Sequence, residues 1–187
     1  MNAVNWIISA DFAILDGVQS ALRSGALDFL MVCLTFLGDY GWFWIAAAAF
    51  FLIPRGTRDM GRAMALAIAA EIIICNLIMK PAFHRIRPCD INAAVTLLVA
   101  RPTDFSFPSG HAAVSFAAAA SIFAFRKRPG AAALILAVLI SFSRIYLYVH
   151  YPSDVLAGAA VGTVCALGAE LAVKRFAGNK KRLSGGG

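Results

Sequence analysis

Residues 131–173 read AAALILAVLISFSRIYLYVHYPSDVLAGAAVGTVCALGAELAV, which is two apolar runs joined by a polar segment. The runs, residues 131–149 and 154–173, are each long enough for a helix that crosses a bilayer, which needs roughly 17 to 25 residues. The joining segment SRIYLYVHYPSD, residues 143–154, carries an arginine, a histidine and an aspartate. An arginine or aspartate at the centre of a membrane helix costs about 2.5 to 3.5 kcal/mol, so such residues near lipid usually have a function. This stretch predicts a membrane hairpin with a functional site at its turn.

The rest of the chain has the composition of a polytopic membrane protein. Of its 187 residues, 60% are apolar and 14% are charged, which excludes an ordinary soluble globular class. Further apolar runs cover about residues 28–53 and 62–80, and a shorter one covers about 109–125. GDYG at residues 38–41 interrupts the first run, which predicts either a broken helix or a short interfacial helix followed by a span. We therefore predict an all-α polytopic membrane helical bundle with about five transmembrane helices.

The N-terminal residues have a weaker membrane signal. Residues 3–23 place apolar side chains at helical spacing with polar side chains elsewhere, a pattern typical of an amphipathic helix at the membrane interface. A further span is the alternative, although two acidic residues disfavour it. The start lacks the cationic region of a cleavable signal peptide. We predict an amphipathic interfacial helix at residues 1–25, a transmembrane domain at 26–176 and a basic cytoplasmic tail at 177–187, whose closing SGGG resembles an added linker.

The formal net charge of +7 is distributed as in a membrane protein rather than as in a nucleic-acid-binding protein. Eleven of the 17 lysines and arginines lie in two short polar breaks, residues 54–62 and 126–130, and in the C-terminal tail. By the positive-inside rule, these segments belong on the cytoplasmic side. Residues 81–108 and the turn at 150–154 then lie together on the extracytoplasmic side. We expect membrane lipids as partners and no nucleic acid.

Three polar segments meet on that extracytoplasmic side, and their cations are typical of an anion site. The segments are KPAFHRIRP at residues 80–88, FPSGH at residues 107–111 and SRIYLYVHYPSD. Lys80 offers a point charge, whereas Arg87 offers a planar fork suited to bidentate phosphate binding. Arg144 adds a second fork of the same kind.

The segment PSGH adds another kind of phosphate ligand, the backbone amide. Pro108 is suited to begin a helix, which leaves the amides of Ser109, Gly110 and His111 without intrahelical partners. A helix N-terminus of this kind binds phosphate oxygens. The Ser109 hydroxyl can donate a further hydrogen bond, and Gly110 lets the backbone approach closely. The segment therefore predicts a phosphate cradle.

His150 and Asp154 make this binding site a candidate active site. Pro152 is expected to separate two helices, with His150 at the end of one and Asp154 in the first turn of the next. The carboxylate can then hold one ring nitrogen of the imidazole and leave the other free to attack phosphorus. His111, on another helix, can protonate the leaving oxygen, a step that typically contributes about 10² to 10⁴ in rate.

Together, the three segments have the pattern K-x6-R-P, P-S-G-H and S-R-x5-H-x3-D, which resembles the three signature motifs of the type 2 phosphatidic acid phosphatase superfamily. This superfamily includes membrane lipid phosphatases and, more distantly, soluble acid phosphatases and vanadium haloperoxidases. The resemblance implies that His150 is a nucleophile that forms a phosphohistidine, that Asp154 orients it and that His111 protonates the leaving group. It implies catalysis without a metal ion or other cofactor. The phosphate ligands that it implies are Lys80, Arg87, Ser109, Gly110 and Arg144.

Several other polar residues match no required motif position. Arg85 and Arg101 are expected to contact lipid head groups, and Asp104 is interpreted as a loop cap rather than a catalytic acid. Glu71 and His84 receive no catalytic role. The four cysteines show neither metal-ligand spacing nor a disulfide framework.

The predicted activity is the hydrolysis of a lipid phosphate or diphosphate in a bacterial cell (inner) membrane, at an active site on the extracytoplasmic face. Because the cradle lies at the membrane interface, the substrate should carry an apolar anchor. Undecaprenyl diphosphate or a broad specificity is favoured by the resemblance, and phosphatidylglycerophosphate and phosphatidic acid are alternatives. Two other hypotheses stay open: a vanadate-dependent haloperoxidase, which the apolar spans disfavour, and a lipid-phosphate-binding protein without turnover. The oligomeric state is not predicted.

Overall fold

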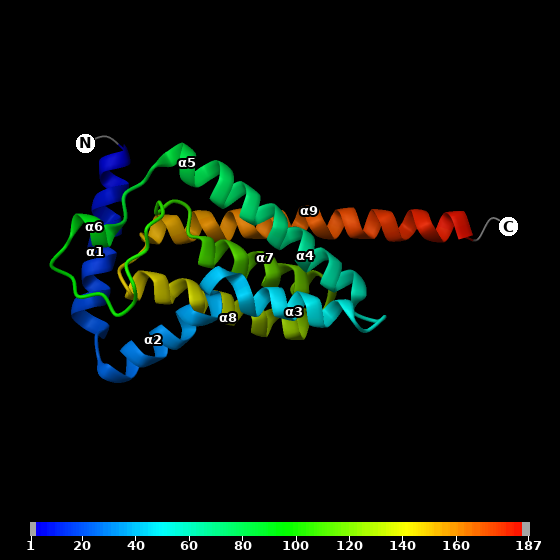
Figure 1. Cartoon of the computed structure of the whole chain (residues 1–187), viewed down its shortest axis with the longest axis horizontal. Coiled ribbons are helices and arrows are strands. Elements are labelled where there is room, and N and C mark those ends of the chain that lie inside the picture. Colours follow the sequence, from blue (N-terminus) through cyan, green and yellow to red (C-terminus); the bar gives the residue numbers. More distant parts are fainter. Residues whose placement is uncertain (1–2, 185–187) are drawn as a thin grey trace.

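The protein is a bundle of helices in the computed structural model, which describes the backbone of residues 3–184 and the side chains of residues 5–177. No strand occurs within residues 3–184, and the predicted all-α fold class is confirmed. The side chains of the predicted basic tail lie outside the described residues from residue 178 onward. The elements shown in Figure 1 are, in chain order, α1 (Ala3–Leu22), α2 (Gly25–Gly38), η1 (Asp39–Gly41), α3 (Trp42–Leu52), α4 (Arg58–Ile72), η2 (Ile73–Met79), α5 (Lys80–Phe83), α6 (Pro88–Ile91), α7 (Gly110–Phe125), α8 (Lys127–Tyr146) and α9 (Pro152–Ser184).

Within the described residues, four helical segments are long and apolar enough to cross a membrane: Gly25–Leu52, Arg58–Ile91, Lys127–Tyr146 and Pro152–Ala177. Helix α7 is also apolar, but its 16 residues are fewer than a typical span has. It packs against α4, α8 and α9 and so lies between the longer helices. The chain is therefore a multi-span membrane protein with a shorter fifth helix inside the bundle.

The apolar run that contains GDYG forms two helices with a sharp turn between them. Helix α2 ends at Gly38, the single turn η1 follows, and α3 begins at Trp42. Gly41 has a φ of +68°, a left-handed conformation that favours glycine. A Cβ at Gly41 would also lie 2.8 Å from Cγ2 of Val114 on α7. The broken-helix interpretation is confirmed, and the break lies directly against α7.

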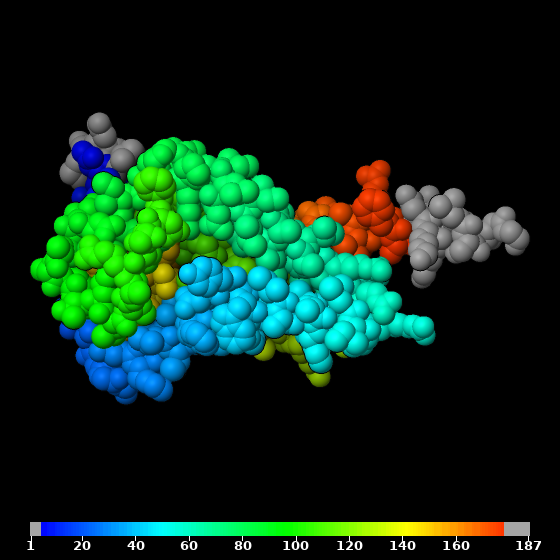
Figure 2. Space-filling view, viewed as in Figure 1, coloured from blue at the N-terminus to red at the C-terminus, as the bar shows by residue number. Residues whose placement is uncertain are grey.

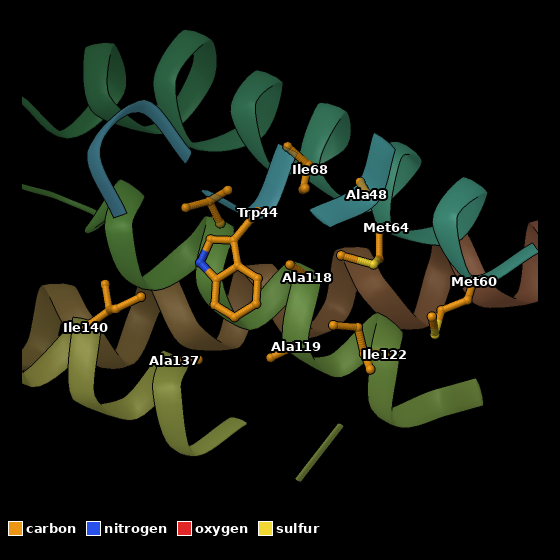
Figure 3. Packing of buried hydrophobic residues seen from close by; sticks show 11 residues of the cluster. Trp44, Ala48, Met60, Met64, Ile68, Ala118, Ala119, Ile122, Ala137 and Ile140 are labelled. Atoms are coloured by element: carbon orange, nitrogen blue, oxygen red, sulfur yellow. The ribbon is translucent and has the colours of Figure 1, made fainter. Parts of the chain in front are cut away.

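Hydrophobic packing fixes α3, α4, α7 and α8 relative to one another. Trp44, Met64 and Ile122 belong to a buried cluster between these helices (Figure 3). The indole N–H of Trp44 donates a hydrogen bond to Ser115 Oγ at 2.9 Å, so this buried donor is satisfied. The cluster therefore holds α7, whose start carries the PSGH segment, in one position.

Small residues let α7 and α9 approach each other closely, and two of them are glycines of AGAAVG at residues 157–162. A Cβ added to Gly158 would overlap the carbonyl oxygen of Ser109, and one added to Gly162 would overlap that of Ala113. Backbone atoms cannot move aside as the end of a long side chain can, so extra volume there forces the helices apart. The two glycines thus set the distance between the helices that begin with the PSGH and PSD segments.

The polar segments lie at one end of the bundle and the cationic breaks lie at the other. In Figure 1, α6, the loop before α7 and the start of α9 lie on the left, whereas the α3–α4 connection lies on the right. Helix α1 crosses the left end and packs against α8 and α9. Polar side chains hold α1 to the end of α8 and the turn after it: Gln19 Nε2 donates to Tyr146 O at 2.6 Å, and Tyr148 Oη donates to Asp16 Oδ1 at 2.7 Å. The predicted N-terminal helix is confirmed, and its depth in the membrane stays a prediction.

Candidate active site

His150 lies in the turn between α8 and α9 and is almost completely buried, with 2% of the residue exposed. Helix α8 ends at Tyr146, not at residue 149 as predicted, because Tyr148 adopts a left-handed φ of 60° that interrupts the helix. The amide of His150 donates a hydrogen bond back to Arg144 O at 3.3 Å. This turn directs the imidazole into the protein.

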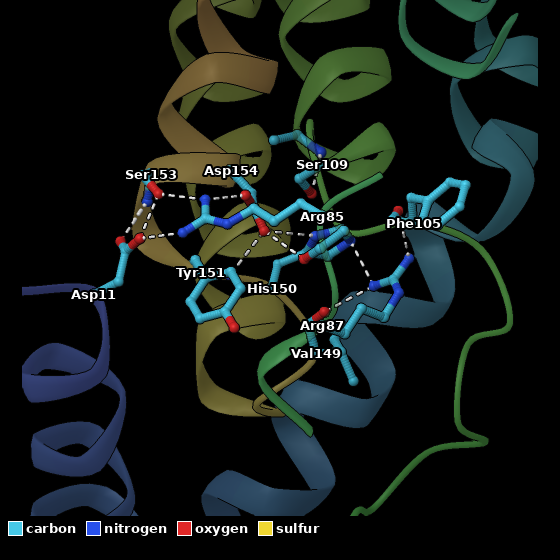
Figure 4. Close-up of polar contacts among 12 residues, drawn as sticks. Asp11, Arg85, Arg87, Phe105, Ser109, Val149, His150, Tyr151, Ser153 and Asp154 are labelled. Carbon is cyan, nitrogen blue, oxygen red and sulfur yellow. Dashed lines mark hydrogen bonds and ion pairs between the residues drawn. The ribbon is translucent and has the colours of Figure 1, made fainter. Parts of the chain in front are cut away.

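One ring nitrogen of His150 faces a cation, and the other faces a carboxylate (Figure 4). Nε2 lies 3.0 Å from Arg87 Nη1, and Nδ1 lies 3.5 Å from Asp154 Oδ2. Because a guanidinium can only donate, Nε2 is the acceptor and Nδ1 carries the ring proton toward the carboxylate. The distance of 3.5 Å is longer than an ordinary hydrogen bond, and Nδ1 has no hydrogen-bond partner among the described residues. The structure therefore brings the predicted pair together, but at a longer distance than predicted.

Asp154 is held in place by donors other than His150. Its carboxylate accepts hydrogen bonds from Ser106 Oγ at 2.5 Å and from the Tyr151 amide at 3.0 Å, and it forms an ion pair with Arg85 at 2.5 Å. Asp154 is fully buried in the first turn of α9, where the helix dipole favours a negative charge. These contacts give the carboxylate one orientation toward His150.

The surroundings of His150 keep its imidazole neutral. Burial has the largest effect and lowers the pKa of His150 well below its usual value of about 6.5. The nearby charges of Arg87 and Arg144 lower this pKa further, and so does His111. Near neutral pH, Nε2 therefore keeps the lone pair that a nucleophile needs.

Arg87 and Lys80 lie at this end of the bundle, as predicted, but both already bind a carboxylate. Asp104 forms ion pairs with Lys80 Nζ and with Arg87 Nη2, the latter at 2.7 Å. Burial alone would raise the pKa of Asp104, but the hydrogen bonds and charges of the two cations outweigh it and lower the pKa to about 2. Asp104 is thus a carboxylate near neutral pH, and its contacts with the two cations were not predicted from the sequence.

The PSGH segment forms the N-terminus of α7, with two differences from the prediction. Helix α7 begins at Gly110 with Ser109 as its N-cap, so Pro108 lies before the helix and does not begin it. The Ser109 amide donates a hydrogen bond to Asp154 O at 3.1 Å, so the prediction that this amide is unpartnered is wrong. Gly110 lies beside Lys80, whose Nζ is 3.9 Å from a Cβ placed on the glycine. The cation and the start of the helix are neighbours, as a phosphate cradle requires.

His111 lies in the first turn of α7 and is held by the turn between α2 and α3. Its Nε2 lies 2.9 Å from Asp39 Oδ1. A Cβ on Gly38 would lie 2.5 Å from Cδ2 of His111, so glycine leaves the space that the ring occupies. No role for Asp39 was predicted from the sequence. The signal that could have found it is an acidic residue inside an otherwise apolar run.

Arg144, the second predicted guanidinium, lies in the last turn of α8 and is buried. Its Nη1 donates a hydrogen bond to Thr35 Oγ1 on α2. Its Nε has no hydrogen-bond partner among the described residues. A buried N–H group without an acceptor is costly, so this side of the guanidinium suits an anion.

Arg85 links α1 to the start of α9 instead of facing lipid. Its guanidinium donates to Asp154 Oδ1 at 2.5 Å and to Ser153 Oγ and Asp11 Oδ2 at 2.7 Å each (Figure 4). Its Cζ lies 3.9 Å from the centre of the Tyr151 ring, within cation–π range. Asp11 is 3% exposed and also accepts a hydrogen bond from the Ser153 amide at 2.9 Å. The prediction of a lipid head-group contact is wrong for Arg85, and Asp11 is a site residue that the sequence did not reveal.

The site lies beside a recess in the surface. Figure 2 shows this recess between the loop before α7, in green, and the α2–α3 turn, in blue to cyan, with yellow atoms of the α8–α9 region at its bottom. Among the residues that the structure describes, no group of three or more His, Cys, Asp or Glu side chains could hold a metal ion. The arrangement combines a nucleophilic imidazole, a second histidine that can move a proton, and cations that can hold an anion.

Known proteins are similar to this chain in sequence and in fold. A family model described as PAP2 superfamily matches residues 61–177. The chain is 35% identical to the undecaprenyl-diphosphatase of Sulfolobus acidocaldarius, over 70% of this chain and 64% of that protein, and so spans less than two thirds of its length. The fold is similar to the crystal structure of Aquifex aeolicus LpxE, with a TM-score of 0.73 and 29% identity over 86% of this chain and 94% of that one. It is also similar to a transmembrane PAP2-type phosphatidylglycerolphosphate phosphatase from Bacillus subtilis, with a TM-score of 0.71 and 30% identity over 96% of this chain and 88% of that one.

Proposed function

Because the chain belongs to the PAP2 superfamily, we propose that it hydrolyses the phosphate or diphosphate head group of a membrane lipid, with His150 as the nucleophile. The observation that carries the proposal is the position of His150. It is buried, with Nε2 beside Arg87 and Nδ1 facing Asp154, and burial lowers the pKa of its ring so that Nε2 keeps its lone pair near neutral pH. A phosphoryl group bound by Arg87 would therefore meet a nitrogen that can attack it.

In the proposed reaction, Nε2 of His150 attacks the phosphorus atom, and the bond between phosphorus and the lipid oxygen breaks. Burial lowers the pKa of His111 to about 4 in the free protein, whereas Asp39 Oδ1, 2.9 Å from Nε2 of His111, and a bound phosphoryl anion both raise it. The protonated ring that forms beside the bound anion gives its proton to the leaving oxygen. A water molecule then attacks the phosphohistidine, His111 takes a proton from this water, and inorganic phosphate leaves. Asp154 stabilises the positive charge that develops on His150 in the first step.

Cations and backbone amides would hold the phosphoryl oxygens during both steps. Lys80, Arg87 and Arg144 supply positive charge, and the start of α7 supplies the amides of Gly110 and His111. Such groups stabilise the charge of a transferring phosphoryl group where water is largely excluded. The proposed mechanism needs no metal ion.

The proposed substrate has its phosphate at the membrane surface. His150 lies in the α8–α9 turn at one end of a bundle of membrane spans, and the recess in Figure 2 opens over the α8–α9 region. A lipid whose apolar chain stays in the bilayer could therefore present its head group to the site. The similarity to an undecaprenyl-diphosphatase favours undecaprenyl diphosphate or a broad specificity, and phosphatidylglycerophosphate and phosphatidic acid are the alternatives.

The proposed location is the extracytoplasmic face of the bacterial cell (inner) membrane. The cationic breaks at residues 54–62 and 126–130 and the His150 site belong to opposite ends of the bundle. The positive-inside rule assigns the cationic end to the cytoplasm. The enzyme would then act on lipid phosphates of the outer leaflet.

The test is a phosphate-release assay of the purified full-length protein with undecaprenyl diphosphate, phosphatidylglycerophosphate and phosphatidic acid. The wild-type protein should release phosphate from at least one of them. His150→Asn should reduce this release by about 10³-fold or more, because asparagine cannot form the covalent intermediate. His84→Asn is the matched control, since His84 is exposed and asparagine tolerates its left-handed φ of 45°.

Three results would contradict the proposal. If the wild-type protein binds these lipids but releases no phosphate, the chain is a binding protein. Equal activity of His150→Asn and His84→Asn would remove His150 from the reaction. Bromide oxidation with hydrogen peroxide and vanadate, without phosphate release, would identify a haloperoxidase instead.

A further inference from the structure

Asp104 occupies the two cations that the proposed function assigns to the substrate phosphate. Its carboxylate forms ion pairs with Lys80 and Arg87 from the loop that precedes α7. A carboxylate and a phosphoryl group use the same kind of donor, and an arginine fork suits either of them. The two anions therefore compete for the same side chains.

Every N–H group of Arg87 already has an acceptor. Nε donates to Asp104 O at 2.9 Å, and Nη2 donates to Asp104 Oδ1 at 2.7 Å and to Phe105 O at 3.4 Å. Nη1 donates to Val149 O at 2.7 Å and faces His150 Nε2 at 3.0 Å. A guanidinium has five N–H groups, so all five are engaged. Three of the acceptors are backbone oxygens, and the fourth, His150 Nε2, must leave Arg87 when it attacks phosphorus. The Asp104 carboxylate is thus the one anionic acceptor that a phosphoryl oxygen would replace among these contacts.

The exposure of the three side chains supports this exchange. The side chains of Lys80 and Arg87 are 12% and 3% exposed, whereas that of Asp104 is 51% exposed. Asp104 therefore covers the two cations from the outside, while Val149 and His150 are buried behind them. An anion that arrives from the membrane surface meets the Asp104 carboxylate before it reaches Arg87.

We propose that Asp104 is an internal counter-anion that binds Lys80 and Arg87 in the free enzyme and releases them to the phosphoryl group in each turnover. The inference rests on the proposed function, because it assumes that both cations bind phosphate. Asp104 compensates the charge of these largely buried cations when no substrate is bound. It also lowers the affinity of the site for inorganic phosphate, so that the product can leave.

A purely structural role of Asp104 makes the opposite prediction. If the carboxylate only held Lys80 and Arg87 in position, removal of its charge would loosen both cations and weaken phosphate binding. Arg87 keeps its bonds to the backbone oxygens of Asp104 and Val149 when the Asp104 side chain changes. The fork therefore stays in place in Asp104→Asn, and the direction of the affinity change distinguishes the two roles.

The experiment measures the dissociation constants of orthovanadate and inorganic phosphate for the purified full-length protein by titration calorimetry, which needs no turnover. Asp104→Asn should bind both anions about tenfold more tightly, because a competing charge is removed. Asp90→Asn is the matched control, because it removes the same charge from a more exposed ion pair with Arg101, 2.8 Å apart. We expect this control to change the constants by less than about twofold.

Unchanged or weaker binding by Asp104→Asn overturns the inference, and so does the absence of binding in both proteins. Equal tightening in Asp90→Asn also overturns it, because a general change of charge would then explain the effect. Asp104→Ser repeats the measurement with a side chain too short to reach Arg87, and thermal denaturation checks that each variant is folded. Failure of the proposed function is recognised separately, since the wild-type protein would release no phosphate from any lipid while calorimetry still reports on Asp104.

Discussion

Arg85 joins three parts of the chain through charges that are largely removed from water. It binds Asp11 on α1 and Asp154 on α9, and it stacks over Tyr151 in the turn before α9. Removal of one partner of a fully buried ion pair typically costs about 3 to 5 kcal/mol, because the remaining charge is left uncompensated. The side chain of Arg85 is 22% exposed, so solvent reduces this cost. Asp154, with 0% exposure, depends more strongly on the contact.

We predict that Arg85→Lys lowers kcat/KM for phosphate release by about tenfold or more, mainly through kcat. Lysine keeps the positive charge, but it lacks the planar fork that reaches two carboxylates at once. Asp154 would then lose one of the donors that orient it toward His150. Arg101→Lys, in a more exposed ion pair, should stay within about twofold of the wild-type protein. If both variants were equally active, Arg85 would have no part in positioning Asp154.

The proposed phosphate-binding and nucleophilic residues were easier to predict than the residues that position them. Lys80, Arg87 and His150 stand out by charge and motif spacing, and the structure brings them to one end of the bundle. The contact between Asp39 and His111 spans 72 positions, and the contact between Arg85 and Asp11 spans 74. Which distant side chains meet depends on how the helices pack, and no local pattern contains that information.

Among the helices, the length of the apolar runs predicted the membrane spans, whereas local backbone conformation decided where helices end. The run at residues 131–149 became α8, which begins at Lys127 and ends at Tyr146. The end follows from the left-handed conformation of Tyr148, a residue type for which that conformation is unusual. The glycines of GDYG predicted the break between α2 and α3, because glycine adopts left-handed backbone conformations more readily than other residues.

We predict that Gly162→Ala forces α7 and α9 apart. The added Cβ would overlap Ala113 O and would lie 2.8 Å from Ala117 N, and both are backbone atoms. Overpacking of this kind typically costs about 1 to 3 kcal/mol. Because α7 carries His111 and α9 carries Asp154, phosphate release should fall together with the melting temperature in detergent.

Gly168, further along α9, provides the matched control for this prediction. Apart from the nearby backbone of α9 itself, no atom of the residues that the structure describes lies within 4 Å of a Cβ placed there, and alanine is a better helix former than glycine by about 1 kcal/mol. Gly168→Ala should therefore leave the melting temperature unchanged or raise it slightly. A melting temperature that is equally low in both variants, or unchanged in both, would contradict close packing of α9 on α7 at Gly162.

On the scale of the whole molecule, the two ends of the bundle differ in how their cations are compensated. At the end that contains His150, five cations pair with carboxylates of the same chain. These are Arg23, Lys80, Arg85, Arg87 and Arg101. At the other end, Arg62 and Lys174 pair with Asp59 and Glu170, whereas Arg55, Arg126 and Arg128 form no ion pair among the described residues. The positive-inside rule counts the lysines and arginines of short loops, so the cations of residues 54–62 and 126–130 favour the cytoplasmic side for this end.

We therefore predict that the end with His150 is extracytoplasmic when the protein is produced in a bacterium. Ala94→Cys marks this end, in the exposed loop before α7, and Gly56→Cys marks the opposite end, in the exposed α3–α4 loop. Both changes are made together with Cys33→Ala, because Cys33 is the exposed native cysteine and the other three are buried.

A maleimide that cannot cross the inner membrane should label Ala94→Cys in intact spheroplasts and should label Gly56→Cys only after detergent is added. The reason is the cost of translocating the loop at residues 54–62, which carries three arginines. Moving one elementary charge across 100 mV costs about 2.3 kcal/mol, so a loop with three positive charges is retained in the cytoplasm. The reverse labelling pattern would place His150 at the cytoplasmic surface, where the site would meet lipid phosphates of the inner leaflet instead of those of the outer leaflet.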